Sequence, residues 1–177
     1  MKLVHGLLTP ALLTLAGISA QGQTATSPFL DCWAKLRIGD SVTMTSDWKE
    51  TIGTTAVLDH KEIRRTVESV TAGGVLVKIE TAGYQRIVST GQTVPTKPFT
   101  VSALLAPPPV KPDLAAIGNE LVSAMGRTFK TQRYNFNANN GRLYVSDEVP
   151  FCVVKMDQPS ADLARSRSYT ISAFNRS

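Results

Sequence analysis

Apolar and polar residues alternate with a period of two along much of the chain, a pattern typical of β-strands. The alternation is clearest over residues 62–81, where two runs rich in β-branched residues flank Ala72-Gly73-Gly74. Adjacent glycines supply the positive φ angles that a tight hairpin turn requires, so the two runs are predicted to pair antiparallel. Alternation then places two sets of residues each on one face: Ile63, Arg65, Val67 and Ser69 in the first run, and Val75, Val77, Ile79 and Thr81 in the second.

Shorter runs of the same kind predict further strands joined by turns. Turns are predicted at Ile38-Gly39-Asp40-Ser41, Gly83 and Asn139-Asn140-Gly141, since glycine and asparagine tolerate positive φ. Asp59, His60 and Lys61 form a polar stretch that we place in another turn. The expected strands cover residues 42–45, 54–58, 84–89, 99–105 (as an edge strand), 128–136, 142–146, 152–156 and 168–174.

Two segments depart from the alternation. Residues 29–36 form a short apolar segment that fits a single helical turn. Residues 113–125 carry apolar residues at helical spacing, but Gly118 interrupts the pattern. We therefore expect a short helical or irregular piece there, followed by a strand from about Glu120 to Met125.

Eight to ten short strands joined by hairpins predict an all-β fold class with minor α content. The expected architecture is a single curved antiparallel sheet or open half-barrel with one or two short helices, forming one domain over residues 29–177. Residues 106–112 (APPPVKP) predict an extended polyproline-type connection, because proline lacks the N–H that a central strand needs. A stiff surface linker is the favoured interpretation of this segment, and a docking motif for an aromatic-lined groove is the alternative.

The N-terminus has the three parts of a secretory signal peptide. Met1-Lys2 gives a positive start, residues 3–18 are uncharged and mostly apolar, and Ile18-Ser19-Ala20 ends in small residues. We expect residues 1–20 to be removed by cleavage near Ala20, residues 21–28 to be a flexible lead-in, and the protein to be exported to the periplasm or the medium. A membrane anchor is the alternative, but the apolar stretch is short, contains Pro10 and is too short to predict a transmembrane span.

Composition and charge narrow the choice of partner. The 177 residues are 42% hydrophobic and 19% charged, which is typical of one globular domain. The net charge of +5 falls to +4 when the signal peptide with Lys2 is removed. Basic residues alternate with polar and apolar ones at strand spacing instead of gathering on one helix, which argues against a nucleic-acid partner.

Cys32 and Cys152 are the two cysteines of the chain, and an oxidising compartment would allow them to pair. A disulfide between them is one prediction. Two separate thiols, one of them buried in the apolar run that begins at Phe151, are the alternative.

The residues that usually carry catalysis are scarce. His60 is the one histidine beyond the predicted signal peptide, and the sequence contains no C-x-x-C, H-E-x-x-H, G-x-S-x-G or phosphate-binding glycine motif. Asp147 and Glu148 could form the acidic pair of a hydrolase, but their place before Val149-Pro150 favours a tight turn. We therefore expect no enzymatic activity, no cofactor and no metal site.

The stretch from Gly141 to Lys155 resembles a pattern, aromatic-x-S-D-E-V-P-G-G-x-V-K, found near the C-terminus of uncharacterised exported bacterial proteins. Those proteins resemble the lipoprotein carriers of the LolA and LppX type, which implies a half-barrel whose concave face holds acyl chains. This chain departs from the pattern at Phe151-Cys152, where glycines are usual. The residues that match the core of the motif are Ser146, Asp147, Glu148, Val149 and Pro150.

Two function classes follow. The favoured one is a non-catalytic carrier of the cell envelope that holds an acyl chain or a lipoprotein on a concave sheet face, and the alternative is an envelope protein that binds a partner through a sheet edge or the proline-rich segment. For any single lining residue, ordinary core packing is the competing interpretation. The candidate lining residues are Val75, Val77, Ile79, Leu143, Val145, Val154 and Met156.

Overall fold

The computed structural model describes residues 29–106, 115–136, 141–158 and 167–177. One short helix precedes ten strands, which confirms the predicted all-β class with minor helix. The helix and strands, in chain order, are α1 (Leu30–Ala34), β1 (Ser41–Ile52), β2 (Thr55–Thr71), β3 (Gly74–Ile87), β4 (Thr93–Pro95), β5 (Phe99–Leu105), β6 (Ala115–Ala124), β7 (Arg127–Phe136), β8 (Gly141–Val145), β9 (Val153–Gln158) and β10 (Arg167–Asn175).

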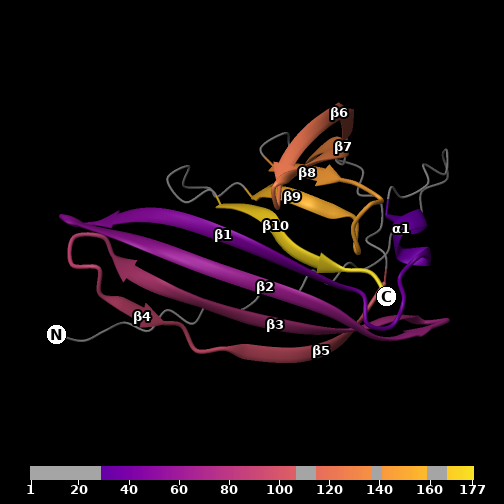
Figure 1. Ribbon diagram of the computed structural model, residues 1–177, viewed down its shortest axis with the longest axis horizontal. Helices are drawn as coiled ribbons and strands as arrows, with labels where there is room; N and C mark the ends of the chain where they lie inside the picture. The colour runs from indigo at the N-terminus through magenta and orange to yellow at the C-terminus, as the bar shows by residue number, and fades with distance from the viewer. Residues whose placement is uncertain (1–28, 107–114, 137–140, 159–166) are drawn as a thin grey trace.

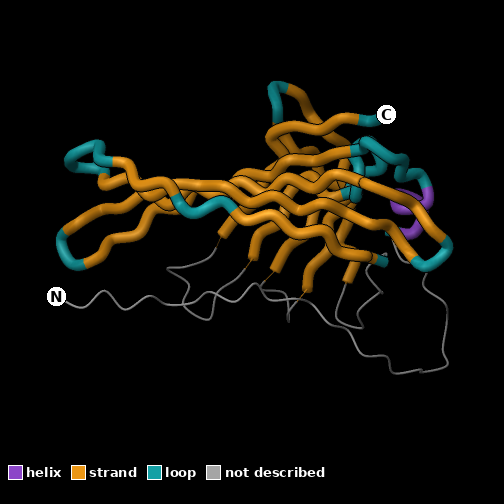
Figure 2. Tube along the Cα trace, turned by 90° about the horizontal axis from the view of Figure 1, so that it is seen from below, coloured by secondary structure: helices purple, strands orange, loops and turns teal. Residues whose placement is uncertain are grey.

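The ten strands form one open antiparallel sheet in the order β4-β3-β2-β1-β10-β9-β8-β7-β6, with β5 paired to β3 as well. Strands β1, β2 and β3 run the length of the molecule, and β6 and β7 rise away from them at the other side of the sheet (Figure 1). The strands lie side by side as a curved layer when the molecule is turned by 90° (Figure 2). The prediction of a single curved sheet is therefore confirmed, and the sheet does not close into a barrel.

The Gly73-Gly74 hairpin is confirmed, with Thr71 opposite Gly74, but its strands are longer than predicted. Residues 55–58 and 62–71 belong to one continuous strand, β2, so the predicted turn at His60 is wrong. Gly83 also lies within β3 and makes no turn. Polar residues can continue these strands because their side chains can lie on the face of the sheet that is not apolar. The pairing of β1 with β2 over the whole length of β1 also satisfies the backbone of the polar stretch.

Two local predictions also need correction. Ser69 does not share the face of Val67, because a bulge between them places Val67 opposite Val77 and Ser69 opposite Leu76. The helical or irregular piece predicted before Glu120 is also wrong, since strand β6 begins at Ala115.

Strand β6 accommodates its irregular sequence with a bulge of its own. The register shifts between Ala116 and Gly118, and Gly118 has a φ of 148° that glycine adopts without strain. The helical spacing of apolar residues is therefore coincidental, and Ile117, Leu121 and Met125 are exposed.

The helix α1 lies at one end of the sheet (Figure 1) and contributes side chains to the hydrophobic core. Phe29, Cys32, Trp33 and Leu36 are buried there. The predicted turn before β1 is confirmed: the buried Asp40 carboxylate accepts the backbone N–H of Arg37 at 2.9 Å and of Ser177 at 2.8 Å.

The predicted signal peptide (1–20), the lead-in (21–28), most of the proline-rich connection (107–112) and part of the Asn139-Asn140-Gly141 turn lie outside the described residues. The pairing of Phe136 with Gly141 nevertheless places β7 and β8 as a hairpin around that turn. Within the described part of the chain, no helix is long and apolar enough to cross a membrane.

Candidate functional site

One face of the sheet carries apolar side chains from β5 across to β7, and we call it the apolar face. Directly paired residues of neighbouring antiparallel strands project to the same side, so the register traces this face from strand to strand. At its β5 edge, Val101 lies opposite Ile79. One row of directly paired residues then runs from β5 to β10 through Phe99, Thr81, Ile63, Met44 and Ile171. A second row continues from β10 to β7 through Tyr169, Met156, Leu143 and Tyr134.

The predicted lining residues divide by exposure. Val75, Val77, Val145 and Val154 are only 5%, 0%, 7% and 0% exposed and belong to the hydrophobic core. Ile79, Leu143 and Met156 are partly exposed and pack against that core. A ligand approaching the apolar face would therefore meet the second group first.

Strand β5 adds lining residues that the sequence analysis missed. Phe99 is 51% exposed and Val101 is 39% exposed, and both continue the apolar face beyond β3. The edge strand itself was predicted, so alternation could have placed both residues on one face. Matching that face to β3 required the pairing register, which the sequence does not supply.

Burial shifts the pKa of two titratable groups on the apolar face, Arg65 and Tyr134. Arg65 stands opposite Val42 on one side and Ile79 on the other, and burial lowers the pKa of its guanidinium. Tyr134 lies at the β7 end of the face, where burial raises the pKa of its hydroxyl. Both shifts have the same physical cause, which is removal of a group from water beside apolar neighbours.

The Ser146–Pro150 motif forms the predicted turn and joins α1 to the sheet. The backbone N–H of Ser146 donates to the carbonyl of Cys152 at 2.8 Å, and Val149 and Pro150 are fully buried. Cys32 of α1 and Cys152 form the predicted disulfide, with Cα atoms 5.9 Å apart. The motif therefore helps to hold the helix against the end of the sheet.

The acidic residues of this turn do not converge. The Asp147 carboxylate lies 3.5 Å from the amine of Lys35, which directly follows α1, and Glu148 forms a 2.7 Å ion pair with Arg127 of β7. Arg176 donates to the backbone carbonyls of both acidic residues. These contacts hold the turn in place and do not assemble an acid–base pair.

Phe151 and Cys152 follow the motif and both have left-handed backbones, with φ of 60° and 63°. Glycine adopts this region freely, whereas a residue with a side chain does so at a cost.

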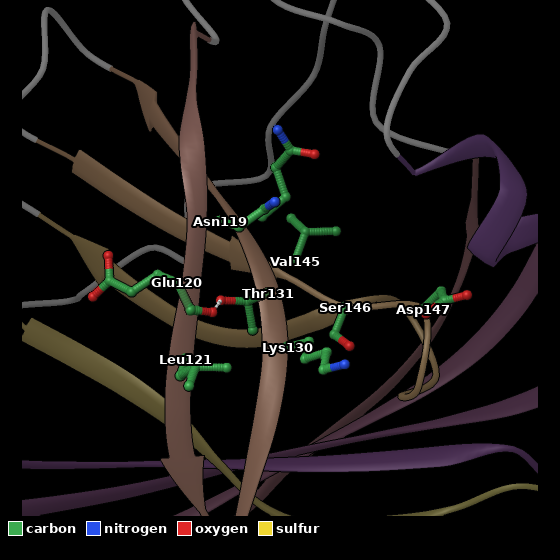
Figure 3. Close-up of a pocket in the computed structure, with 9 residues that line it drawn as sticks. Asn119, Glu120, Leu121, Lys130, Thr131, Val145, Ser146 and Asp147 are labelled. Carbon is green, nitrogen blue, oxygen red and sulfur yellow. Dashed lines mark hydrogen bonds between the residues drawn. The ribbon is translucent and has the colours of Figure 1, made fainter.

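A pocket of about 450 Å³ lies between the β6–β7 hairpin and the end of β8 (Figure 3). Two of its polar side chains already have partners: the Thr131 hydroxyl donates to the Glu120 carbonyl at 2.7 Å, and the Glu120 carboxylate pairs with Arg133 at 2.9 Å. In Figure 3 the Glu120 carboxylate points away from the other labelled side chains. The residues that line the pocket are Asn119, Glu120, Leu121, Lys130, Thr131, Gln132, Val145, Ser146 and Asp147.

His60 lies on the opposite side of the sheet from the apolar face. Its Nδ1 is 2.8 Å from the Asp47 carboxylate, and its ring stacks on Tyr84 at a centroid distance of 4.8 Å. These contacts hold the His60 ring on the surface of the sheet. Among the described residues, neither contact partner is a serine or cysteine nucleophile. The described residues also contain no group of three or more histidine, cysteine, aspartate or glutamate side chains that could hold a metal ion.

No protein-family model matches the chain, and no curated protein matches it significantly. Function therefore has to be argued from the site.

Proposed function

We propose that this protein is an exported, non-catalytic component of the cell envelope that binds an apolar ligand, an acyl chain or the acylated part of a lipoprotein, on the apolar face. The observation that carries the proposal is the exposure of Phe99 and Val101 in continuity with the partly exposed Ile79. An exposed apolar surface that adjoins a core is a typical site of ligand or partner contact.

Two further features support the carrier function. Among the described residues no second sheet packs on the apolar face of the open sheet, so a chain-like ligand can be accommodated. The left-handed conformation of Phe151 and Cys152 also gives a physical reason for glycines in the motif of the exported proteins that this chain resembles. The proposal includes removal of residues 1–20, and an intact mass that begins at Gln21 in the exported protein is the corresponding test.

The binding test uses substitutions in β5, because its side chains can be changed with little effect on folding. We expect the Phe99→Ser/Val101→Ser variant to bind a fluorescent fatty acid about thirtyfold more weakly than the wild type. This estimate assumes about 1 kcal/mol of lost apolar burial at each site. Fluorescence titration measures the affinity, and circular dichroism checks the fold.

Leu104→Ser is the matched control. Leu104 lies in the same strand, is 60% exposed and faces the opposite side of the sheet, opposite Leu76. Its substitution should leave the affinity unchanged. Equal losses in both variants, or no binding by the wild type up to the solubility limit of the fatty acid, would contradict the proposed function.

The second candidate function is binding of a partner protein through the free edge at β5. This strand pairs with β3 on one side and exposes apolar side chains on both faces, with Phe99 and Val101 on one and Leu104 on the other. Such an edge can accept another strand. In that case the Leu104→Ser substitution would weaken binding as well.

A further inference from the structure

Arg65 is set among apolar side chains near the middle of the long hairpin. It lies in β2 between Ile63 and Val67 along the strand, and its cross-strand neighbours are Val42 and Ile79. Its side chain is partly buried on the apolar face, whereas the adjacent Arg64 is exposed on the opposite side. The sequence alternation already separates these two arginines onto different faces.

The Arg65 guanidinium has no acidic partner within the described part of the chain. The ion pairs there use Arg127, Arg133 and Arg167 but not Arg65. Burial alone lowers its pKa, with no neighbouring carboxylate to oppose that effect. An arginine is almost never buried unpaired, because removing its charge from water without compensation is costly.

The nearest charges on the apolar face leave its centre positive. Lys61 lies four residues before Arg65 in the same strand and on the same face, opposite Ser46. Asp59, the acidic residue two positions further back, is already paired with Arg167 at 2.5 Å. The centre of the face therefore combines apolar surface with uncompensated positive charge.

We infer that Arg65 is the anion-binding residue of the apolar face and that the ligand is a long-chain fatty acid whose carboxylate it holds. A guanidinium binds a carboxylate through two parallel N–H···O bonds, and apolar neighbours strengthen such bonds by excluding water. The acyl chain would extend from Arg65 over Ile79 towards Val101. This inference rests on the proposed function and adds the chemical class of the ligand.

The experiment compares 11-(dansylamino)undecanoic acid with its methyl ester, which keeps the chain and removes the charge. We expect the wild type to bind the acid about tenfold or more tightly than the ester. Arg65→Gln should abolish this preference by weakening acid binding while leaving ester binding unchanged. Arg64→Gln is the matched control, since it removes the same charge from the other face and should keep the preference.

Two further variants separate ligand binding from a structural role. Arg65→Met should raise the melting temperature by a few degrees, because it replaces a partly buried cation, which has no acidic partner among the described residues, with an apolar side chain of similar length. The same variant should lose the preference for the acid. Arg65→Lys should retain part of the preference, since it keeps the charge but not the paired donors.

The outcomes distinguish this inference from the proposed function. If Arg65→Gln and the wild type prefer the acid equally, Arg65 is not an anion-binding residue although the apolar face still binds ligand. If Lys61→Gln instead of Arg65→Gln removes the preference, the assignment of the residue is wrong. If the wild type binds neither probe, the proposed function fails and this inference fails with it.

Discussion

Phe151 and Cys152 occupy backbone conformations that their side chains disfavour. A left-handed conformation costs a non-glycine residue about 1–2 kcal/mol. Contacts made by the same two side chains offset this cost: the Phe151 ring packs edge-on against Trp33 at 5.6 Å, and Cys152 is bonded to Cys32. Both contacts link the turn to α1, so glycine at these positions would relax the backbone but lose the attachment of the helix.

A pair of variants measures the backbone cost at position 152 without the disulfide. Cys32→Ala/Cys152→Gly should be more stable than Cys32→Ala/Cys152→Ala by about 1 kcal/mol, because only glycine adopts a φ of 63° without strain. Urea denaturation gives the difference. Cys32→Gly/Cys152→Ala is the control and should be the least stable of the three, since position 32 is helical and glycine destabilises a helix.

At the scale of elements, α1 depends on its attachment to the sheet. A helix of five residues is too short to be stable alone, and it is held by buried apolar residues and by a disulfide that closes 120 residues of chain. The chain-entropy model assigns about 4–5 kcal/mol to such a loop. Reduction should therefore lower the melting temperature by about 10 °C, as measured by circular dichroism with and without reductant.

The Cys32→Ala/Cys152→Ala variant is the control for reduction and should melt at the same temperature in both conditions. Free thiols that can be alkylated in the native exported protein would show that the bridge does not form in the cell.

The sequence predicted elements well where a local signal determines them. The Gly73-Gly74 hairpin and the turn at Asp147–Pro150 follow from residues within the turn itself. The sequence-based prediction failed where pairing with a neighbouring strand determines the local conformation. His60 lies opposite Tyr84 and Gly83 lies opposite Lys61 in the long β2–β3 pairing, although their own segments resemble turns. The bulge at Ile117–Gly118 hid strand β6 in the same way, because it breaks the period of two.

At the scale of the whole molecule, alternation placed the candidate lining residues on strand faces but not at particular depths. Val77 and Ile79 look equivalent in sequence, yet Val77 is fully buried in the core and Ile79 is partly exposed at its margin. The significance of Arg65 was equally hidden. It depends on which strands flank it and on the lack of an acidic partner among the described residues, and neither property is local in sequence.

A carrier and an edge-binding protein differ in how the stability of the whole molecule responds to ligand and to concentration. A ligand that binds only the folded state at 100 times its dissociation constant stabilises that state by about 2.7 kcal/mol. For a domain of this size, we expect a fatty acid at that excess to raise the melting temperature by about 5–10 °C.

If the protein is a carrier, its melting temperature should also be independent of protein concentration, because the apolar face of one molecule is sufficient for binding. Association through the β5 edge would instead make the melting temperature rise with protein concentration and leave it unchanged by fatty acid. Scanning calorimetry over a hundredfold range of protein concentration, with and without the fatty acid, separates the two functions. At the same fatty-acid concentration, the thirtyfold weaker binding of the Phe99→Ser/Val101→Ser variant should leave it only about a third of the wild-type shift in melting temperature.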